Sequence, residues 1–139
     1  MKTLAKLIVF ILSITLSNAQ EINGQSITVT IDNVSNNSGK VLFTLHTSDT
    51  FMKGSGIQNV ESKIENGKVI VTFKNVVSGT YAIMALHDEN ENHRMDFQEN
   101  GRPKEDYGTS NNAMSFGPPQ FIDSKFEVSN EDLEIKIRF

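Results

Sequence analysis

The residues best suited to chemistry lie in one polar segment, residues 88–99, with the sequence DENENHRMDFQE. Calcium takes six to eight oxygen ligands, and an EF-hand loop supplies them from loop positions 1, 3, 5, 7, 9 and 12. Those positions hold Asp88, Asn90, Asn92, the main-chain carbonyl of Arg94, Asp96 and Glu99. The spacing of oxygen-bearing residues predicts a calcium site, with three carboxylates balancing the charge of the ion.

The flanks of this segment differ from those of an EF-hand. Loop position 6, normally glycine, is His93, which can adopt a left-handed conformation at some cost. A strand enters the segment, and Gly101-Arg102-Pro103 prevents a helix after it. Residues 88–99 therefore have the ligand spacing of an EF-hand loop but are not expected to have the EF-hand fold. The alternative is a metal-free loop, because Asn and Asp also populate ordinary exposed turns.

The other candidate chemistries have weaker support. His46 is expected at the surface of a strand, and His87 is expected to be a structural hydrogen-bond partner. Zinc needs three or four nitrogen or sulfur ligands, and the chain has no cysteine and no matching histidine spacing. Ser110 could be considered as a nucleophile, but no GxSxG elbow is present. We therefore expect no enzymatic activity and rank a hydrolytic enzyme last.

The segment after the predicted ligands has the composition of an ordered binding loop. Prolines fix φ, glycines permit turns that a Cβ would block, and Asn side chains cap the backbone locally. The residues expected to build this loop are Gly101, Pro103, Glu105, Tyr107, Gly108, Ser110, Asn111, Asn112, Gly117, Pro118 and Pro119. Such a rigid loop either presents a binding surface or covers the edge of a sheet, and the sequence leaves both open.

The elements that must position these loops are strands, because apolar residues recur with a period of two. Alternation predicts strands over 27–31 and 41–46, joined by a turn at 36–39. Asn66-Gly67 predicts a type I′ hairpin turn. Its register places Glu65 opposite Lys68, Ile64 opposite Val69, Ser62 opposite Val71 and Val60 opposite Phe73. A strand over 81–87 that is apolar on both faces is expected to be central, and 126–128 and 133–139 alternate again.

About seven short strands in one small chain indicate an all-β protein. We expect an antiparallel two-sheet sandwich, immunoglobulin-like or transthyretin-like, with a long, otherwise structureless loop over 88–120 after the central strand. A small closed barrel is the alternative.

The N-terminus has the layout of a secretory signal. Lys2 and Lys6 precede an apolar run over 7–16, and Ser17-Asn18-Ala19 ends on small residues. We expect a signal peptide over 1–19, a single domain over 20–139, and a periplasmic or extracellular location. A retained membrane anchor is the alternative, although the run is short for a span of about 20 residues. No cysteine follows it, so a lipoprotein is not expected.

Charge limits the choice of partners. The chain has 13 basic and 17 acidic residues, and losing Lys2 and Lys6 leaves 11 against 17, a net charge of −6. Nucleic acids and anionic membranes require a basic surface, so neither is expected, and neither is stable membrane insertion after signal cleavage. The chain has no Trp and two Tyr, which disfavours a sugar-binding platform. A protein or another component of the cell envelope is the expected partner.

Several motifs resemble those of a known family, the bacterial domain of unknown function 2141. The resemblance covers nearly all of the mature chain, and the motifs that carry it are GTYA at 79–82, HDENEN at 87–92, Asp96, GRPKEDYG at 101–108, SNN at 110–112 and FGPPQF at 116–121. The resemblance implies an exported bacterial β-sandwich and no established activity. The chain differs from the family pattern at His93, where members of the family usually carry glycine.

These observations favour an exported binding or accessory module with a calcium-stabilised loop. A purely structural or interaction domain without a metal is the alternative.

If the signal is read as predicted, the native protein begins at Gln20. Intact mass measurement or N-terminal sequencing of the protein recovered from its producing cell checks this. A mature chain that still carries Met1 would contradict the prediction of export.

Overall fold

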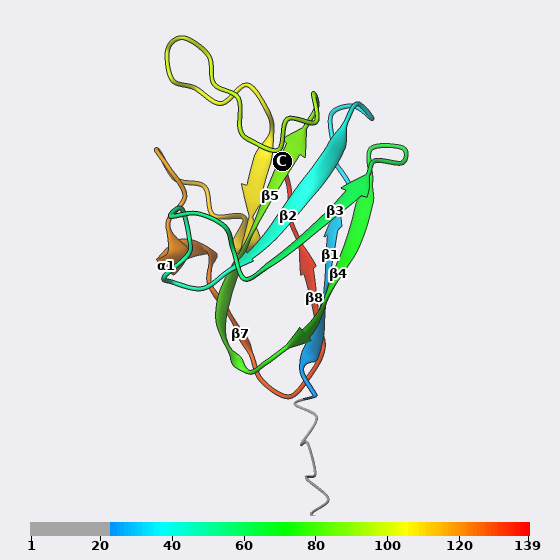
Figure 1. The fold of residues 1–139 in the computed structure, drawn as a ribbon, viewed down its shortest axis with the longest axis vertical. Coiled ribbons are helices and arrows are strands. Elements are labelled where there is room, and N and C mark those ends of the chain that lie inside the picture. Colours follow the sequence, from blue (N-terminus) through cyan, green and yellow to red (C-terminus); the bar gives the residue numbers. More distant parts are fainter. Residues whose placement is uncertain (1–22) are drawn as a thin grey trace, which may run out of the picture.

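The computed structural model describes residues 23–139, so the predicted signal peptide and its cleavage point lie outside the described residues. Figure 1 shows an all-β molecule with a long loop extending beyond one end of the strands. Across residues 23–139, no helix has the length and apolar character needed to cross a membrane.

Within residues 23–139, eight strands form two sheets that pack as a sandwich (Figure 1). The strands are β1 (Gln25–Ile31), β2 (Lys40–His46), β3 (Gln58–Lys63), β4 (Val69–Val76), β5 (Gly79–Asp88), β6 (Tyr107–Thr109), β7 (Phe126–Val128) and β8 (Leu133–Lys136). One sheet has the order β4-β1-β8 and the other β3-β2-β5-β6, with β7 also pairing with β5. The predicted two-sheet sandwich is therefore confirmed, and the sheets do not merge into a single closed one.

The core lies between the sheets and is built from alternate residues of the strands. In β1, the side chains of Ile27, Val29 and Ile31 are fully buried, whereas Thr28 and Thr30 are partly exposed. On the facing sheet, Val41, Phe43 and Leu45 of β2 are also fully buried. Period-two alternation produces this arrangement because successive side chains of a strand point to opposite faces.

The path of the chain between the sheets differs from the expected path in two places. We expected residues 27–31 and 41–46 to be neighbours, but β1 pairs with β4 and β8, whereas β2 pairs with β3 and β5. The turn at 36–39 therefore crosses from one sheet to the other. Strand β8 pairs with β1 in parallel, which is the one parallel pair among the ladders of the described residues.

The Asn66-Gly67 turn forms as predicted, but its two strands then separate. Glu65 and Lys68 exchange main-chain hydrogen bonds of 3.0 Å, and φ is +52° at Asn66 and +71° at Gly67. Beyond this pair the predicted register is wrong, because β3 joins β2 and β4 joins β1. Both strands face the same core, although they belong to opposite sheets. Their alternation of apolar residues is therefore the same as that of two strands paired in a hairpin.

The segment 88–120, expected to be a long structureless loop, contains regular structure. It includes β6 and a 3₁₀ turn, η1 (Ser110–Asn112), and an isolated bridge joins Phe97 to Pro103. A single helical turn, α1 (Phe121–Ser124), follows it. These elements lie along the edge of β5, and their positions decide the shape of the candidate site.

Replacing Gly67 with valine is expected to destabilise the fold by more than about 1 kcal/mol. A β-branched residue resists φ of +71°, and a Cβ here would stand 3.1 Å from the Val34 carbonyl oxygen. Gly67→Asn is the matched control, because Asn tolerates the left-handed region and its loss should be smaller. Urea unfolding measures both variants, and an unchanged midpoint for Gly67→Val would contradict this turn geometry.

Candidate functional site

Asp88 is the buried anchor of the polar loop, the name that we give to residues 88–103, which comprise the predicted ligand segment and the turn after it. Asp88 ends β5 with its side chain fully buried. Its carboxylate accepts main-chain N–H bonds from Asn92 (3.0 Å) and His93 (2.8 Å). His93 has φ of +61°, so it adopts the left-handed conformation that the loop requires at that position. The loop therefore closes back on Asp88 within five residues.

Three further predicted ligands meet beside this anchor. The side-chain amides of Asn90 and Asn92 donate to the carboxylate of Asp96, at 2.7 Å and 3.0 Å. These bonds, that of Asn92 first, lower the pKa of Asp96 below its ordinary value. Asn92 thus links Asp88 and Asp96, and one network joins four of the six residues predicted as ligands.

The other two predicted ligands, the main-chain carbonyl of Arg94 and the side chain of Glu99, make no hydrogen bond to this network within residues 23–139. The Arg94 guanidinium Nε lies 3.9 Å from Asp96 Oδ1, so a positive charge stands beside the network. Glu99 is exposed and makes no side-chain hydrogen bond or ion pair within the described part of the chain. The expected set of three carboxylates does not assemble: between residues 23 and 139, no three His, Cys, Asp or Glu side chains are grouped so that they could hold a metal.

Glu105 is one of the residues expected to build the loop, but the contacts that it makes were not indicated by the sequence. It is buried, and its carboxylate accepts main-chain N–H bonds of 3.1 Å from both Glu89 and Asp96. A single side chain therefore holds the beginning and the later part of the polar loop. The donors lie 16 and 9 residues away in sequence, so no local pattern indicated this contact.

Ser110 closes a gap in the edge of β5. Along that edge, β7 pairs with residues 79–81 and β6 with residues 84–86, so the N–H of Ile83 has no strand partner. The buried Ser110 hydroxyl oxygen accepts this N–H at 2.9 Å and donates its own proton to the Ser124 carbonyl. Ser110 thus replaces a missing ladder bond, which is a structural role for this hydroxyl.

The two asparagines after Ser110 tie the loop to distant segments. Both have positive φ, +67° at Asn111 and +50° at Asn112. Asn111 donates to the Lys125 carbonyl at 2.7 Å, and Asn112 donates to that of Lys136 at 2.9 Å and accepts from the N–H of Arg138. We expected local caps, but the partners, which include the Asp123 carbonyl for Asn111, lie 12 to 26 residues away.

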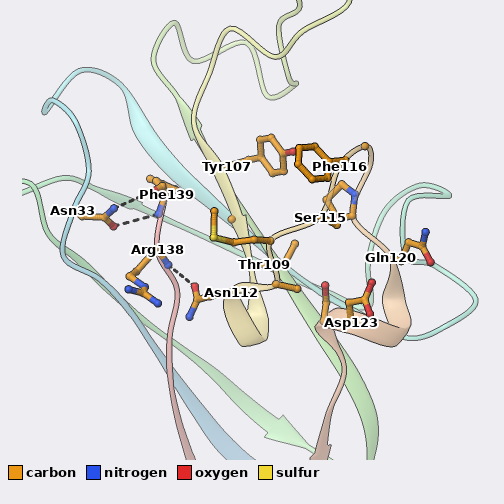
Figure 2. Close-up of a pocket in the computed structure, with 16 residues that line it drawn as sticks. Asn33, Tyr107, Thr109, Asn112, Ser115, Phe116, Gln120, Asp123, Arg138 and Phe139 are labelled. Atoms are coloured by element: carbon orange, nitrogen blue, oxygen red, sulfur yellow. Dashed lines mark hydrogen bonds between the residues drawn. The ribbon is translucent and has the colours of Figure 1, made fainter.

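These tethers border a first hollow of about 690 Å³ beside the C-terminus (Figure 2). Figure 2 shows the bonds from Asn33 to Phe139 and from Arg138 to Asn112 along one side of it. Gly108 permits the close packing here, because a Cβ would stand 2.5 Å from the Arg138 carbonyl oxygen. Glycine is required at position 108 because two backbones approach each other closely. At Gly101 and Gly117 it is required for a different reason, because both have positive φ in open turns.

A second hollow, which we call the apolar groove, lies on the outer face of the β2-β5 sheet and has a volume of about 740 Å³. Its floor is formed by Leu42, Thr44 and His46 of β2 with Met84 and Leu86 of β5. Its walls come from the two loops: Met95, Phe97, Gly101, Arg102 and Pro103 on one side, and Ser115, Phe116, Gly117, Pro118 and Pro119 on the other, with Tyr107 and Met52. The floor of the groove thus comes from predicted strands, and most of its walls come from the segment that the sequence predicted as a long loop.

The two strand-end histidines are both buried. His46 was expected at the surface, but loop residue Phe51 covers it edge-on at 5.6 Å, and Thr50 Oγ1 lies 3.1 Å from its Nδ1. Burial lowers the pKa of His46. His87 is the structural residue that we expected, with Nε2 2.8 Å from the Ser38 carbonyl oxygen and its ring stacked on Phe139.

The fold and the site define a small β-sandwich domain with a polar loop and an outer apolar groove. The chain belongs to the family described as uncharacterized protein conserved in bacteria (DUF2141), which matches residues 29–136, and the resemblance seen in the motifs is confirmed. No curated protein matches the chain.

One similar solved structure is a pilus-presented adhesin, Spy0125 (Cpa). It is 10% identical to this chain with a TM-score of 0.28, and the match covers 83% of this chain and 26% of the adhesin. The chain therefore spans about a quarter of that protein, and a TM-score this low supports no argument about function.

Ser110→Ala is expected to cost about 1–3 kcal/mol of folding free energy, because it leaves the Ile83 N–H and the Ser124 carbonyl unpaired in a buried site. Chemical denaturation measures the loss. Ser115→Ala, at an exposed serine of the same loop, is the control and should change stability by less than about 0.5 kcal/mol. Equal stability of the two variants would show that the Ser110 hydroxyl does not complete the edge of β5.

Proposed function

We propose that this protein is an exported binding module whose binding surface is the apolar groove and whose polar loop is stabilised by calcium. One observation carries the proposal: residues 95–103 of the polar loop form a wall of the groove. Anything that holds the loop in place therefore also holds the groove in shape. Export rests on the predicted signal peptide, and the acidic mature chain suits a protein or envelope partner.

The chemistry of the loop supports calcium as the stabilising ion. Asp88 and Asp96 supply carboxylate oxygens, and Asn90 and Asn92 supply amide oxygens within the same hydrogen-bonded network. The main-chain carbonyl of Arg94 would add a further oxygen ligand to those four residues. An amide exposes an oxygen in place of a nitrogen when it rotates by half a turn, so the contacts to Asp96 can convert into contacts to a cation.

The position of Glu99 makes this a weak site. Without that residue, two carboxylates balance the charge of the ion, and Arg94 stands beside one of them. Few charges in a loop place calcium affinity near the extracellular range of about 10⁻⁴–10⁻³ M. An exported protein can meet calcium at that concentration, whereas a cytosolic one would not.

A metal-free structural domain is the second candidate, and a specific observation favours it. Both oxygens of Asp88 already accept main-chain N–H bonds, and Glu105 holds the loop from the other side. The loop would then be a packed turn that needs no ion.

Calcium titration distinguishes the two candidates. With calcium at ten times Kd, binding to the folded state alone adds about 1.4 kcal/mol, so the thermal midpoint should rise above that in EDTA. Asp96→Asn should abolish the rise, because it removes a carboxylate from the network without burying a new group.

Two controls accompany this titration. Asp49→Asn, at an exposed aspartate outside the loop, should keep the full response to calcium. Magnesium prefers six waters and an octahedral site, so it should shift the midpoint much less. Equal shifts with calcium and magnesium would replace the calcium hypothesis with the metal-free one.

A further inference from the structure

The register of the strands makes the apolar groove elongated. On the outer face, β2 and β5 stack three rows of side chains: Leu42 beside Leu86, Thr44 beside Met84, and His46 beside Ala82. Residues 42 to 46 are four positions apart, so the floor runs for roughly 13 Å along the strands. A floor of this shape suits a narrow, extended ligand better than a compact one.

The side chains over this floor are adaptable and apolar. Met52, Met84 and Met95 all line the groove, and unbranched thioethers adjust to the contour of a flexible ligand. Phe97 and Phe116 stand at the walls with 59% and 111% exposure. Large aromatic rings left in water beside a hollow are typical of a surface that acquires a ligand.

The charge of the groove points to an anion. No residue that lines it is acidic, although the chain carries more acidic than basic residues. Arg102, on the loop wall, is exposed and makes no ion pair in the part of the chain that the structure describes. On the floor of the groove, burial lowers the pKa of His46, which disfavours a positive charge on its imidazole. One free positive charge therefore stands beside an apolar channel.

We propose that the apolar groove binds a single-chain fatty carboxylate, with its hydrocarbon chain along β2 and β5 and its carboxylate at Arg102. The proposal rests on the binding role of the groove given above and names the ligand class. Guanidinium pairs with a carboxylate through two parallel hydrogen bonds, which fixes the head of such a ligand. The methionines and the row of Leu42 and Leu86 take the hydrocarbon chain.

The methionines supply the test, because their methyl groups report on the groove separately from the rest of the protein. Met52, Met84 and Met95 line the groove, whereas Met114 is fully exposed and lines the first hollow. The purified protein, labelled with ¹³C at the methionine methyls, is titrated with decanoate below its micelle concentration. The three groove methyls should shift in a saturable way, and that of Met114 should not.

Charge is tested with a ligand and a variant. Decyltrimethylammonium has the same chain length and the opposite charge, and it should bind about tenfold more weakly than decanoate. Arg102→Gln should weaken decanoate binding by a similar factor and leave the folded spectrum unchanged, because Arg102 is exposed. Arg138→Gln, at an exposed arginine of the first hollow, is the matched control and should bind decanoate as the wild type does.

Each other result overturns the proposal in a recognisable way. If the cationic amphiphile binds as tightly as decanoate, the anion at Arg102 is wrong, while the groove remains a binding surface. If neither amphiphile moves the groove methyls, the proposed binding role of the groove fails as well. If the same methyls shift with protein concentration alone, a second copy of the chain is the occupant.

Discussion

The central constraint of this structure is that β5 must be covered on both faces. Its inner face, with Tyr81, Ile83 and Ala85, packs into the core between the sheets. Its outer face carries Met84 and Leu86, which are also apolar, and neither sheet of the described residues packs over them. Leaving such a face in water costs about 25 cal/mol per Å² of apolar surface. The two long loops that follow β5 supply the cover, and most unusual features of the chain serve to hold them there.

Loops can cover a sheet only if their main-chain groups are satisfied, because a buried unpaired N–H or C=O costs about as much as a lost hydrogen bond. The chain meets this requirement with side chains in place of strands. Glu105 accepts two N–H groups of the polar loop, and Ser110 pairs the N–H of Ile83 where β6 and β7 leave a gap. Asn112 binds the main chain next to β8 from both its amide oxygen and its amide nitrogen. The loops are consequently fixed to the sandwich at several points.

The cover is incomplete, and the incomplete part is the functional region that we propose. Between the two loops a hollow of about 740 Å³ remains over the middle of the sheet. Its size is that of a pocket for a small ligand, and its lining has the expected majority of apolar groups with a few polar ones. The polar loop, which carries the candidate calcium ligands, is at the same time a wall of this hollow. Under our proposal, an ion bound by the loop would therefore also hold the groove in shape.

The sequence by itself determined the described strands other than β6, the Asn66-Gly67 turn, the central position of β5 and the family, because these depend on local alternation, on φ preferences and on motifs. It also placed Asp88, Asn90, Asn92 and Asp96 in one loop, where ligand spacing is a local property. Only the tertiary structure decided which sheet each strand joins, because a strand that faces the core shows the same apolar pattern from either side. It likewise separated Glu99 from the network and brought in Glu105, and it buried His46 beneath Phe51. These contacts depend on how the chain folds in three dimensions, and neither the spacing nor the composition of the residues specifies that path.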